Sequence, residues 1–258
     1  MARAPVYEVS RPPRYRIATP AGPLDTAGVS IPAFAEPPTW SADLVAEVDR
    51  AFAVVGAATP GWPDPHPDRS PLEEEYSRVL DPGKYRILDT RVEAWVQVLA
   101  ARGLASTQDA PALDQDWQGA VRKPGDLARV RAVRPARPGG LTLLLATTLV
   151  DGAPFGLDVG VADESGRAVF VDMVPGCGCD ACDSGSAELL ETLDGWVQTV
   201  ARGGVVHARG ADGHITRTLT GWTAQGDGLR TGWQADQWLE ESRGRLHGVQ
   251  RWIGAPWL

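Results

Sequence analysis

Three cysteines with C-x-C-x-x-C spacing are the residues best suited to chemistry: Cys177, Cys179 and Cys182. Thiolates this close in the chain can converge on one soft or borderline cation, and the glycines between and before them let the backbone turn tightly. Zn²⁺ takes four ligands in a tetrahedron, and the chain has no fourth cysteine. The candidates for a fourth ligand are Asp180, Asp183, His214, water and His207, of which we select His207. We predict that the three sulfur atoms lie within about 4 Å of one another.

The same thiols fit two other interpretations. Cys179 and Cys182 are a candidate dithiol pair for redox or nucleophilic chemistry, because the N-terminus of a following helix lowers a cysteine pKa. Thioredoxin-like sites also need a proline before a later strand, however, and none occurs between Pro175 and Pro256. The other interpretation is a tight turn of reduced cysteines, with Asp183 and a neighbouring serine capping the helix. An iron–sulfur cluster is disfavoured because it normally takes four cysteines.

The segment around the cysteines resembles a family signature. The string Cys-Gly-Cys-Asp-Ala-Cys-Asp at residues 177–183 follows a predicted strand and precedes a predicted helix. It is similar to the signature of an uncharacterised family of actinobacterial proteins, over about residues 140–205. Because that family has no assigned activity, the resemblance implies no substrate and no mechanism. It implies that the loop is a hallmark of the family, which favours a metal site or a structural turn.

The N-terminal part of the chain is predicted to be helical after an extended arm. Residues 1–38 contain eight prolines and little periodicity, which predicts the arm. Apolar residues at helical spacing then predict a helix that begins at Ser41. A second helix is predicted to begin at Pro71, within a capping box, and a third contains Leu88 and ends at Gly103.

The middle of the chain is predicted to be a sheet. A polar loop over about residues 104–125 is followed by alternation at 129–133 and by an apolar run at 141–149. Two further strands are predicted at 156–161 and 168–173. Because the turns between these strands are short, we predict a four-stranded antiparallel meander.

The C-terminal third is predicted to add helices and hairpins. A helix over residues 186–202 follows the cysteine loop, and hairpins follow at 205–219 and 220–233. Apolar residues at helical spacing from Trp238 to Ile253 predict a C-terminal helix.

Together these elements predict an α+β fold with N-terminal helices, an antiparallel meander, a helix after the cysteine loop, hairpins and a C-terminal helix. The absence of alternating βαβ units disfavours a doubly wound sheet. The predicted organisation is an arm at 1–38 and a single domain at 39–258, with a helical part at 39–103 and a sheet-containing part at 127–258.

Tryptophans are concentrated near the C-terminus: Trp222, Trp233, Trp238, Trp252 and Trp257. Exposed tryptophans on hairpins could stack on sugars or bases, or anchor a partner. Their strand-like and helix-like spacing is more typical of a core. We therefore predict that the first four pack onto the sheet or onto the helix at 186–202.

Charged residues supply weaker candidates. Arg129 and Arg131 project from the same face of a strand, which indicates either an anion-binding stripe or an exposed sheet face that carries charge. The net charge favours the charged face. The acidic run at residues 73–75 suits the first turn of a helix, so we interpret it as complementing the helix dipole. His66 lies in a proline-rich loop with no partner visible in the sequence.

Composition bounds the class of protein. The 258 residues carry a formal net charge of −8, which argues against a protein that binds nucleic acid or an anionic membrane. The N-terminus lacks the apolar core of a secretory signal, and the longest apolar run, at 141–150, is half of what a membrane-spanning helix needs. Three cysteines do not make a disulfide framework, so we predict a cytoplasmic protein.

No catalytic fingerprint is present: the chain lacks H-E-x-x-H, G-x-S-x-G, a Walker A loop and a dinucleotide motif. We therefore predict a cytoplasmic binding or interaction protein rather than an enzyme. Either Zn²⁺ or local turn chemistry organises its cysteine loop. We expect no nucleic acid or membrane partner and leave a protein partner open. The alternative is a thiol-dependent redox protein or enzyme that uses Cys179 and Cys182.

Overall fold

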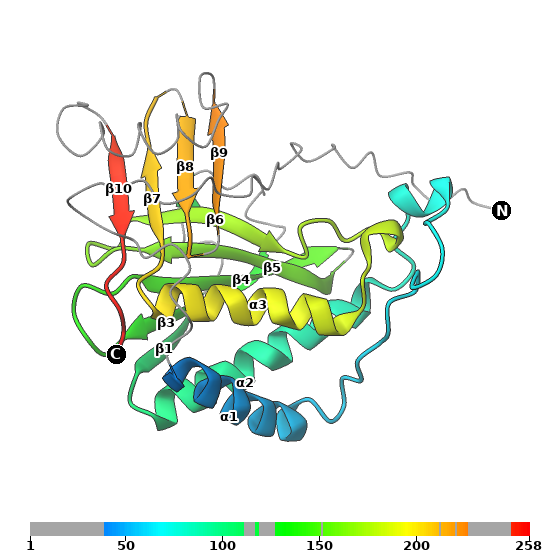
Figure 1. The fold of residues 1–258 in the computed structure, drawn as a ribbon, viewed down its shortest axis with the longest axis horizontal. Helices are drawn as coiled ribbons and strands as arrows, with labels where there is room; N and C mark the ends of the chain where they lie inside the picture. The colour runs from blue at the N-terminus through cyan, green and yellow to red at the C-terminus, as the bar shows by residue number, and fades with distance from the viewer. Residues whose placement is uncertain are drawn as a thin grey trace.

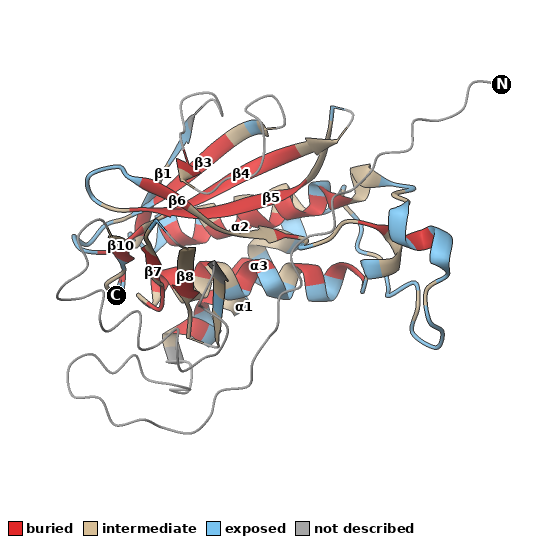
Figure 2. Cartoon of the chain, turned by 90° about the horizontal axis from the view of Figure 1, so that it is seen from above, coloured by how far each residue is buried: buried red, intermediate tan, exposed pale blue. Residues whose placement is uncertain are grey.

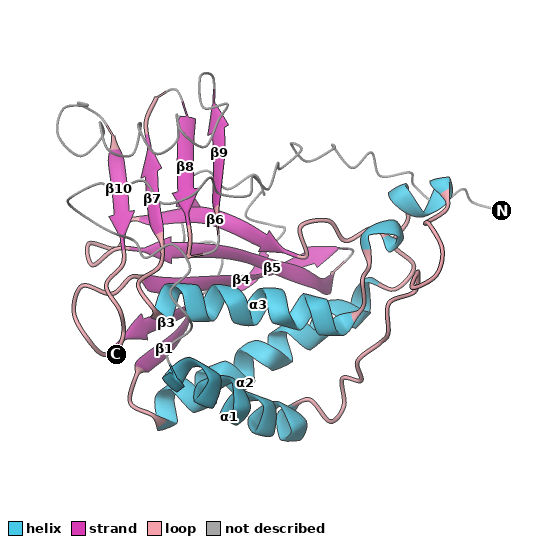
Figure 3. Cartoon of the chain, viewed as in Figure 1, coloured by secondary structure: helices cyan, strands magenta, loops and turns pink. Residues whose placement is uncertain are grey.

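The computed structural model describes residues 39–110, 117–118, 127–150, 152–211, 213–219, 221–226 and 249–258. The strands in this part of the chain form a six-stranded sheet and a four-stranded sheet (Figures 1 and 3). Helices and strands occur in separate runs, so the predicted α+β fold is confirmed. The arm predicted for residues 1–38 lies outside the described residues.

The larger sheet is built on the predicted meander. Its four central strands are β3 (Leu127–Pro135), β4 (Thr142–Val150), β5 (Ala153–Ala162) and β6 (Ala168–Val174). Each is antiparallel to the next, which confirms the meander. The edges are β1 (Ala105–Ala110), antiparallel to β3, and the two-residue β2 (Trp117–Gln118), parallel to β6.

Three helices lie on one side of this sheet (Figure 1). They are α1 (Thr39–Val55), α2 (Ile87–Ala101) and α3 (Ser186–Ala201). Leu143 and Leu145 of β4 belong to the apolar cluster that includes the helices, whereas Leu144 between them belongs to a cluster on the other face. Buried positions therefore line both the strands and the helix faces turned toward them (Figure 2). Among the described helices, none has the length and apolarity to cross a membrane.

Two predictions for the N-terminal half are corrected. The loop predicted at 104–125 begins with β1, whose polar residues suit an edge strand with one exposed face. The helix predicted from Pro71 is only a 3₁₀ turn, η1 (Glu73–Ser77), followed by η2 (Pro82–Arg86), which leads into α2. The capping interaction comes from Glu75, whose carboxylate accepts a hydrogen bond from the Leu72 N–H at 2.6 Å. The Glu75 side chain is buried and forms ion pairs with Arg69 and Arg78. These contacts hold the segment in a short turn, and it does not continue as a longer helix.

The second sheet has the order β10-β7-β8-β9. Its strands are β7 (Val206–Arg209), β8 (Gly213–Arg217), β9 (Trp222–Gly226) and β10 (Gln250–Ile253). β7 and β8 confirm the hairpin predicted at 205–219. The prediction of a C-terminal helix is wrong for residues 250–253. These residues form β10, which pairs with β7 and alternates between a buried Trp252 and an exposed Ile253. The rest of that helix and the second arm of the later hairpin lie outside the described residues.

The described tryptophans of the tail are structural. Trp252 and Trp257 are buried, and Trp222 is half-buried against the second sheet. The indole of Trp252 donates to the Arg167 carbonyl at 2.8 Å, and that of Trp257 donates to the Leu141 carbonyl at 3.2 Å. The predicted burial is therefore confirmed for Trp252. Trp233 and Trp238 lie outside the described residues.

Candidate metal centre

The three cysteine sulfurs converge in the loop between β6 and α3. Cys177, Cys179 and Cys182 place their Sγ atoms within 4.8 Å of one another, and the first two sulfurs are 3.2 Å apart. The predicted convergence is confirmed at this slightly larger spacing. A 3₁₀ turn, η5 (Asp180–Cys182), brings the third cysteine back toward the other two. Around a tetrahedral Zn²⁺ with Zn–S bonds of about 2.3 Å, sulfurs lie about 3.8 Å apart, so the spacing fits one ion after a small adjustment.

The three thiols differ in exposure. Cys179 is buried, Cys177 is half-buried and Cys182 is exposed, so the cluster reaches the surface at Cys182. Desolvation, reinforced by Cys179 and Cys177, raises the pKa of Cys182 to about 12. Desolvation and the neighbouring Cys177 thiol also raise the pKa of Cys179, and a hydrogen bond with Cys182 partly offsets this. A thiol with a raised pKa is a weak nucleophile at neutral pH. These directions disfavour the thiolate form at Cys179 and Cys182, the pair that the dithiol interpretation uses.

The aromatic rings of Phe155 and Tyr85 pack against the cysteine loop at Gly178. The ring of Phe155 on β5 lies against Gly178, where an added Cβ would be only 1.9 Å from the ring's Cζ. Tyr85 packs edge-on against Phe155 at 5.1 Å between ring centroids, and its hydroxyl donates to the Gly178 carbonyl at 3.3 Å. The position between Cys177 and Cys179 therefore requires glycine because a side chain has no space.

Replacing Gly178 with alanine is expected to displace the loop. The methyl group would overlap the Phe155 ring, and overpacking of this kind costs about 1–3 kcal/mol. Gly176→Ala is the matched control, because a Cβ at that position meets no atom within 4 Å. Thermal melting and Zn²⁺ titration of both variants check the prediction. Equal behaviour of the two variants would contradict it.

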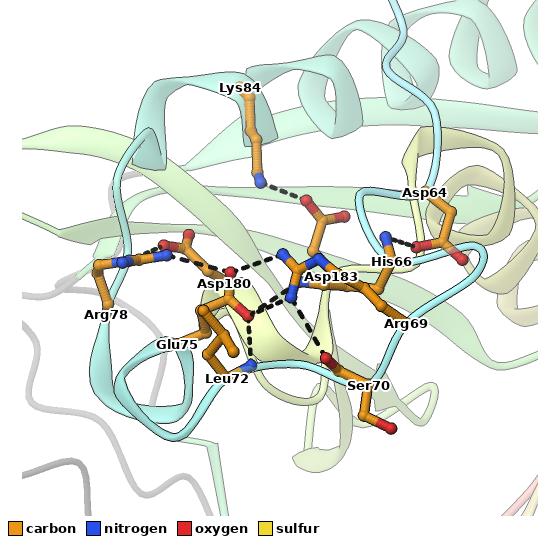
Figure 4. Close-up of polar contacts among 10 residues, drawn as sticks. All are labelled: Asp64, His66, Arg69, Ser70, Leu72, Glu75, Arg78, Lys84, Asp180 and Asp183. Atoms are coloured by element: carbon orange, nitrogen blue, oxygen red, sulfur yellow. Dashed lines mark hydrogen bonds and ion pairs between the residues drawn. The ribbon is translucent and has the colours of Figure 1, made fainter.

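The loop is held by residues 62–86, which we call the clamp segment (Figure 4). Asp180 accepts hydrogen bonds from Arg78 Nε at 2.8 Å and from the Leu80 N–H at 3.1 Å. Asp183 accepts from the Trp62 indole at 2.9 Å and forms an ion pair with Lys84. The two carboxylates flank Cys182, so the clamp segment fixes the third cysteine from both sides.

Glu75 is the centre of a second set of contacts in the clamp segment. Its buried carboxylate pairs with Arg69 at 3.0 Å and with Arg78 at 3.3 Å, and His66 Nε2 lies 3.3 Å away. His66 therefore has a partner that the sequence did not show. The three glutamates at 73–75 do not share the predicted role of complementing a helix dipole. Glu75 is buried in ion pairs, whereas Glu73 and Glu74 are exposed.

Glu75→Gln is expected to make the free energy of unfolding less dependent on pH in the acid range. The Arg69 guanidinium, followed by the Leu72 N–H, lowers the pKa of Glu75 from 4.5 to about 2. A carboxylate with a lowered pKa stabilises the fold above about pH 4.5, and this contribution is lost as the pH falls toward 2. Urea unfolding between pH 2.5 and 7 should show a shallower pH dependence for Glu75→Gln than for wild type. The exposed neighbour supplies the control, Glu74→Gln, and a similar flattening there would contradict the prediction.

His207, the selected fourth ligand, is not brought to the sulfurs. It lies on β7, beyond the C-terminal end of α3, whereas the cysteine loop precedes the N-terminal end of that helix (Figure 1). A helix of 16 residues is about 24 Å long. His207 Nδ1 is 2.8 Å from the Thr216 hydroxyl, and its ring stacks on His214 at 5.5 Å. Burial lowers the pKa of His207 to about 3, so it is a neutral core residue.

Two arginines of β3, Arg129 and Arg131, are paired with carboxylates. Arg131 is buried and pairs with Asp109 and Glu93, both at 2.8 Å. Arg129 pairs with Asp89 at 3.4 Å. These ion pairs join β1, β3 and α2, so they do not favour an anion-binding stripe. The predicted exposed face is wrong for Arg131, because its ion pairs bury it against α2.

Fold and site together define an α+β protein with a three-cysteine candidate metal centre. The chain belongs to a family of unknown function (DUF6226), whose model matches residues 48–258. The match includes the clamp segment and all three cysteines, so both parts of the site lie within the family's shared region. No curated protein and no solved structure matches the chain. An actinobacterial origin and the seven-residue signature stay predictions.

Proposed function

We propose that this chain is a metal-binding protein that holds one Zn²⁺ ion on Cys177, Cys179 and Cys182. The observation that carries the proposal is the convergence of three sulfurs within 4.8 Å in a loop that the clamp segment and Phe155 hold in place. Thiolate sulfur is a preferred ligand of Zn²⁺, and a preorganised set of three lowers the cost of ordering them around the ion.

The proposed ion organises the start of α3. Between Gly176 and Asp183 the loop has no apolar side chain larger than alanine apart from the cysteines, so hydrophobic burial contributes little to its order. Metal coordination supplies the missing free energy, because a site that forms only in the folded chain adds its binding energy to folding. The free thiols suit a reducing compartment such as the cytoplasm, and we propose that location for the protein.

Titration of the reduced protein with Zn²⁺ tests the proposal. We expect about one ion per chain. Loss of a residue that only contacts a metal ligand weakens binding by up to about 100-fold. Replacing one of the three cysteine ligands with serine should therefore weaken binding by more than this. Ser184→Ala, an exposed change in the same loop, is the matched control and should bind like wild type. Absence of binding in wild type, or equal affinity in Cys179→Ser, would refute the proposal.

A further inference from the structure

Building on the proposed metal centre, we infer that the fourth coordination position is open to a ligand from outside the chain, and that this ligand is a small thiol. The three cysteines account for three of the four positions that Zn²⁺ fills. Closed sites with four protein ligands are typical of purely structural zinc, whereas three protein ligands leave a position for exchange. The origin of the fourth ligand therefore decides what the site can bind.

The neighbouring carboxylates are engaged elsewhere. Asp180 accepts from Arg78 and from the Leu80 N–H, and Asp183 accepts from Trp62, Lys84 and the Gly185 N–H. Among the described residues, the donor atoms that gather within 4.8 Å are the three sulfurs and include neither carboxylate. Turning either one to the metal would break its contacts with the clamp segment.

The described histidines make their contacts away from the sulfurs. His66 lies against Glu75 at 3.3 Å, and His207 lies 2.8 Å from the Thr216 hydroxyl and stacks on His214. Over residues 39–110, 152–211 and 213–219, where these three histidines lie, none belongs to the sulfur group. The fourth histidine of the chain, His247, lies outside the described residues and is addressed by the experiment below.

The open side of the cluster is at the surface. Cys182 is exposed, and the space beside Gly176, next to Cys177, holds no atom within 4 Å of an added Cβ. A small molecule can therefore approach the metal from this side without displacing the buried Cys179. The clamp segment contacts the loop through the ion pairs of Asp180 with Arg78 and of Asp183 with Lys84 (Figure 4).

The chemistry of the site favours sulfur as the fourth donor. Three thiolates make the ion a soft centre, for which a further thiolate is a better match than a carboxylate. The three nearby carboxylates, Glu75, Asp180 and Asp183, are paired with three cations, Arg69, Arg78 and Lys84. Each of these three carboxylates therefore has a cationic partner that offsets its charge near the loop.

Visible spectroscopy of the Co²⁺-loaded full chain tests the inference, with 2-mercaptoethanol as the probe under anaerobic conditions. We expect a saturable shift of the d–d bands at one thiol per cobalt, with the cobalt still bound after gel filtration. Ser184→Ala should show the same shift. Bands that do not respond to the thiol, or extraction of the cobalt by it, would overturn the inference.

Two further results separate this inference from the proposed function. A band change on His247→Ala in the absence of added thiol would assign the fourth position to the protein and overturn the open position alone. Absence of any sulfur-to-cobalt charge-transfer band in wild type would instead refute the metal centre itself.

Discussion

Chelation of Zn²⁺ is expected to lower the melting temperature of the wild-type protein by about 8–16 °C. A ligand present at 1,000 times its Kd stabilises the folded state by about 4 kcal/mol. In a chain of this size, each kcal/mol shifts the melting temperature by about 2–4 °C. The loss should not unfold the protein at room temperature, because one continuous apolar cluster extends from α1 through the larger sheet to Trp257. Differential scanning calorimetry of the Zn²⁺-loaded protein, with and without an excess of chelator, measures the shift.

The serine variant of the buried cysteine provides the decisive comparison. Cys179→Ser should melt at a lower temperature than wild type and should not respond to the chelator, because its metal ligand set is broken. Ser184→Ala should retain the full response. If chelation leaves the wild-type curve unchanged, and Cys179→Ser costs only about the 1 kcal/mol of a lost helix cap, the local-turn interpretation holds.

Elements whose partners are neighbours in the chain could be predicted from the sequence. The strands from β3 to β6 are separated by short turns, so antiparallel pairing follows from the connections alone. β1 could not be found this way, because a polar edge strand lacks the apolar alternation that marks a half-buried one. β10 is four residues long and takes its stability from pairing with β7, about 40 positions earlier in the chain, which no local pattern records.

The cysteine ligands of the candidate site could be predicted from the sequence. The contacts by which the clamp segment holds them could not. Cysteine spacing within one loop limits how far apart the sulfurs can lie, so their convergence follows from local geometry. Arg78 and Asp180 are 102 residues apart in the sequence. A short sequence motif cannot reveal a contact over such a separation. The assignment of His207 failed for the converse reason: it is close in sequence to α3, but the length of that helix separates it from the loop.

Asp194→Ala is expected to cause the largest loss of stability among single substitutions in the helices. Asp194 on α3 accepts hydrogen bonds from Arg91 Nε at 2.9 Å and from the Trp95 indole at 2.6 Å, both on α2. The Arg91 side chain is 4% exposed and lies under the ring of Phe52 from α1. Arg91 also pairs with Asp49 at 2.8 Å, but the Asp49 side chain is 62% exposed, so Asp194→Ala leaves the buried guanidinium with only a solvent-screened partner. The loss should therefore approach the roughly 3–5 kcal/mol expected when one partner of a buried ion pair is removed. Urea unfolding at pH 7 measures the loss.

An exposed ion pair between α1 and the end of α2 supplies the matched control. Glu47 and Arg102 form a comparable carboxylate–guanidinium contact at the surface, so Glu47→Ala should cost far less than Asp194→Ala. Equal losses for Asp194→Ala and Glu47→Ala would contradict the argument from burial. The double variant Arg91→Met/Asp194→Leu should recover most of the stability, because two apolar side chains replace the buried charges and the remaining carboxylate, Asp49, is exposed to solvent. Recovery in the double variant would show that the single substitution destabilises by removing the buried partner of Arg91, and that packing between α2 and α3 does not itself depend on the ion pair.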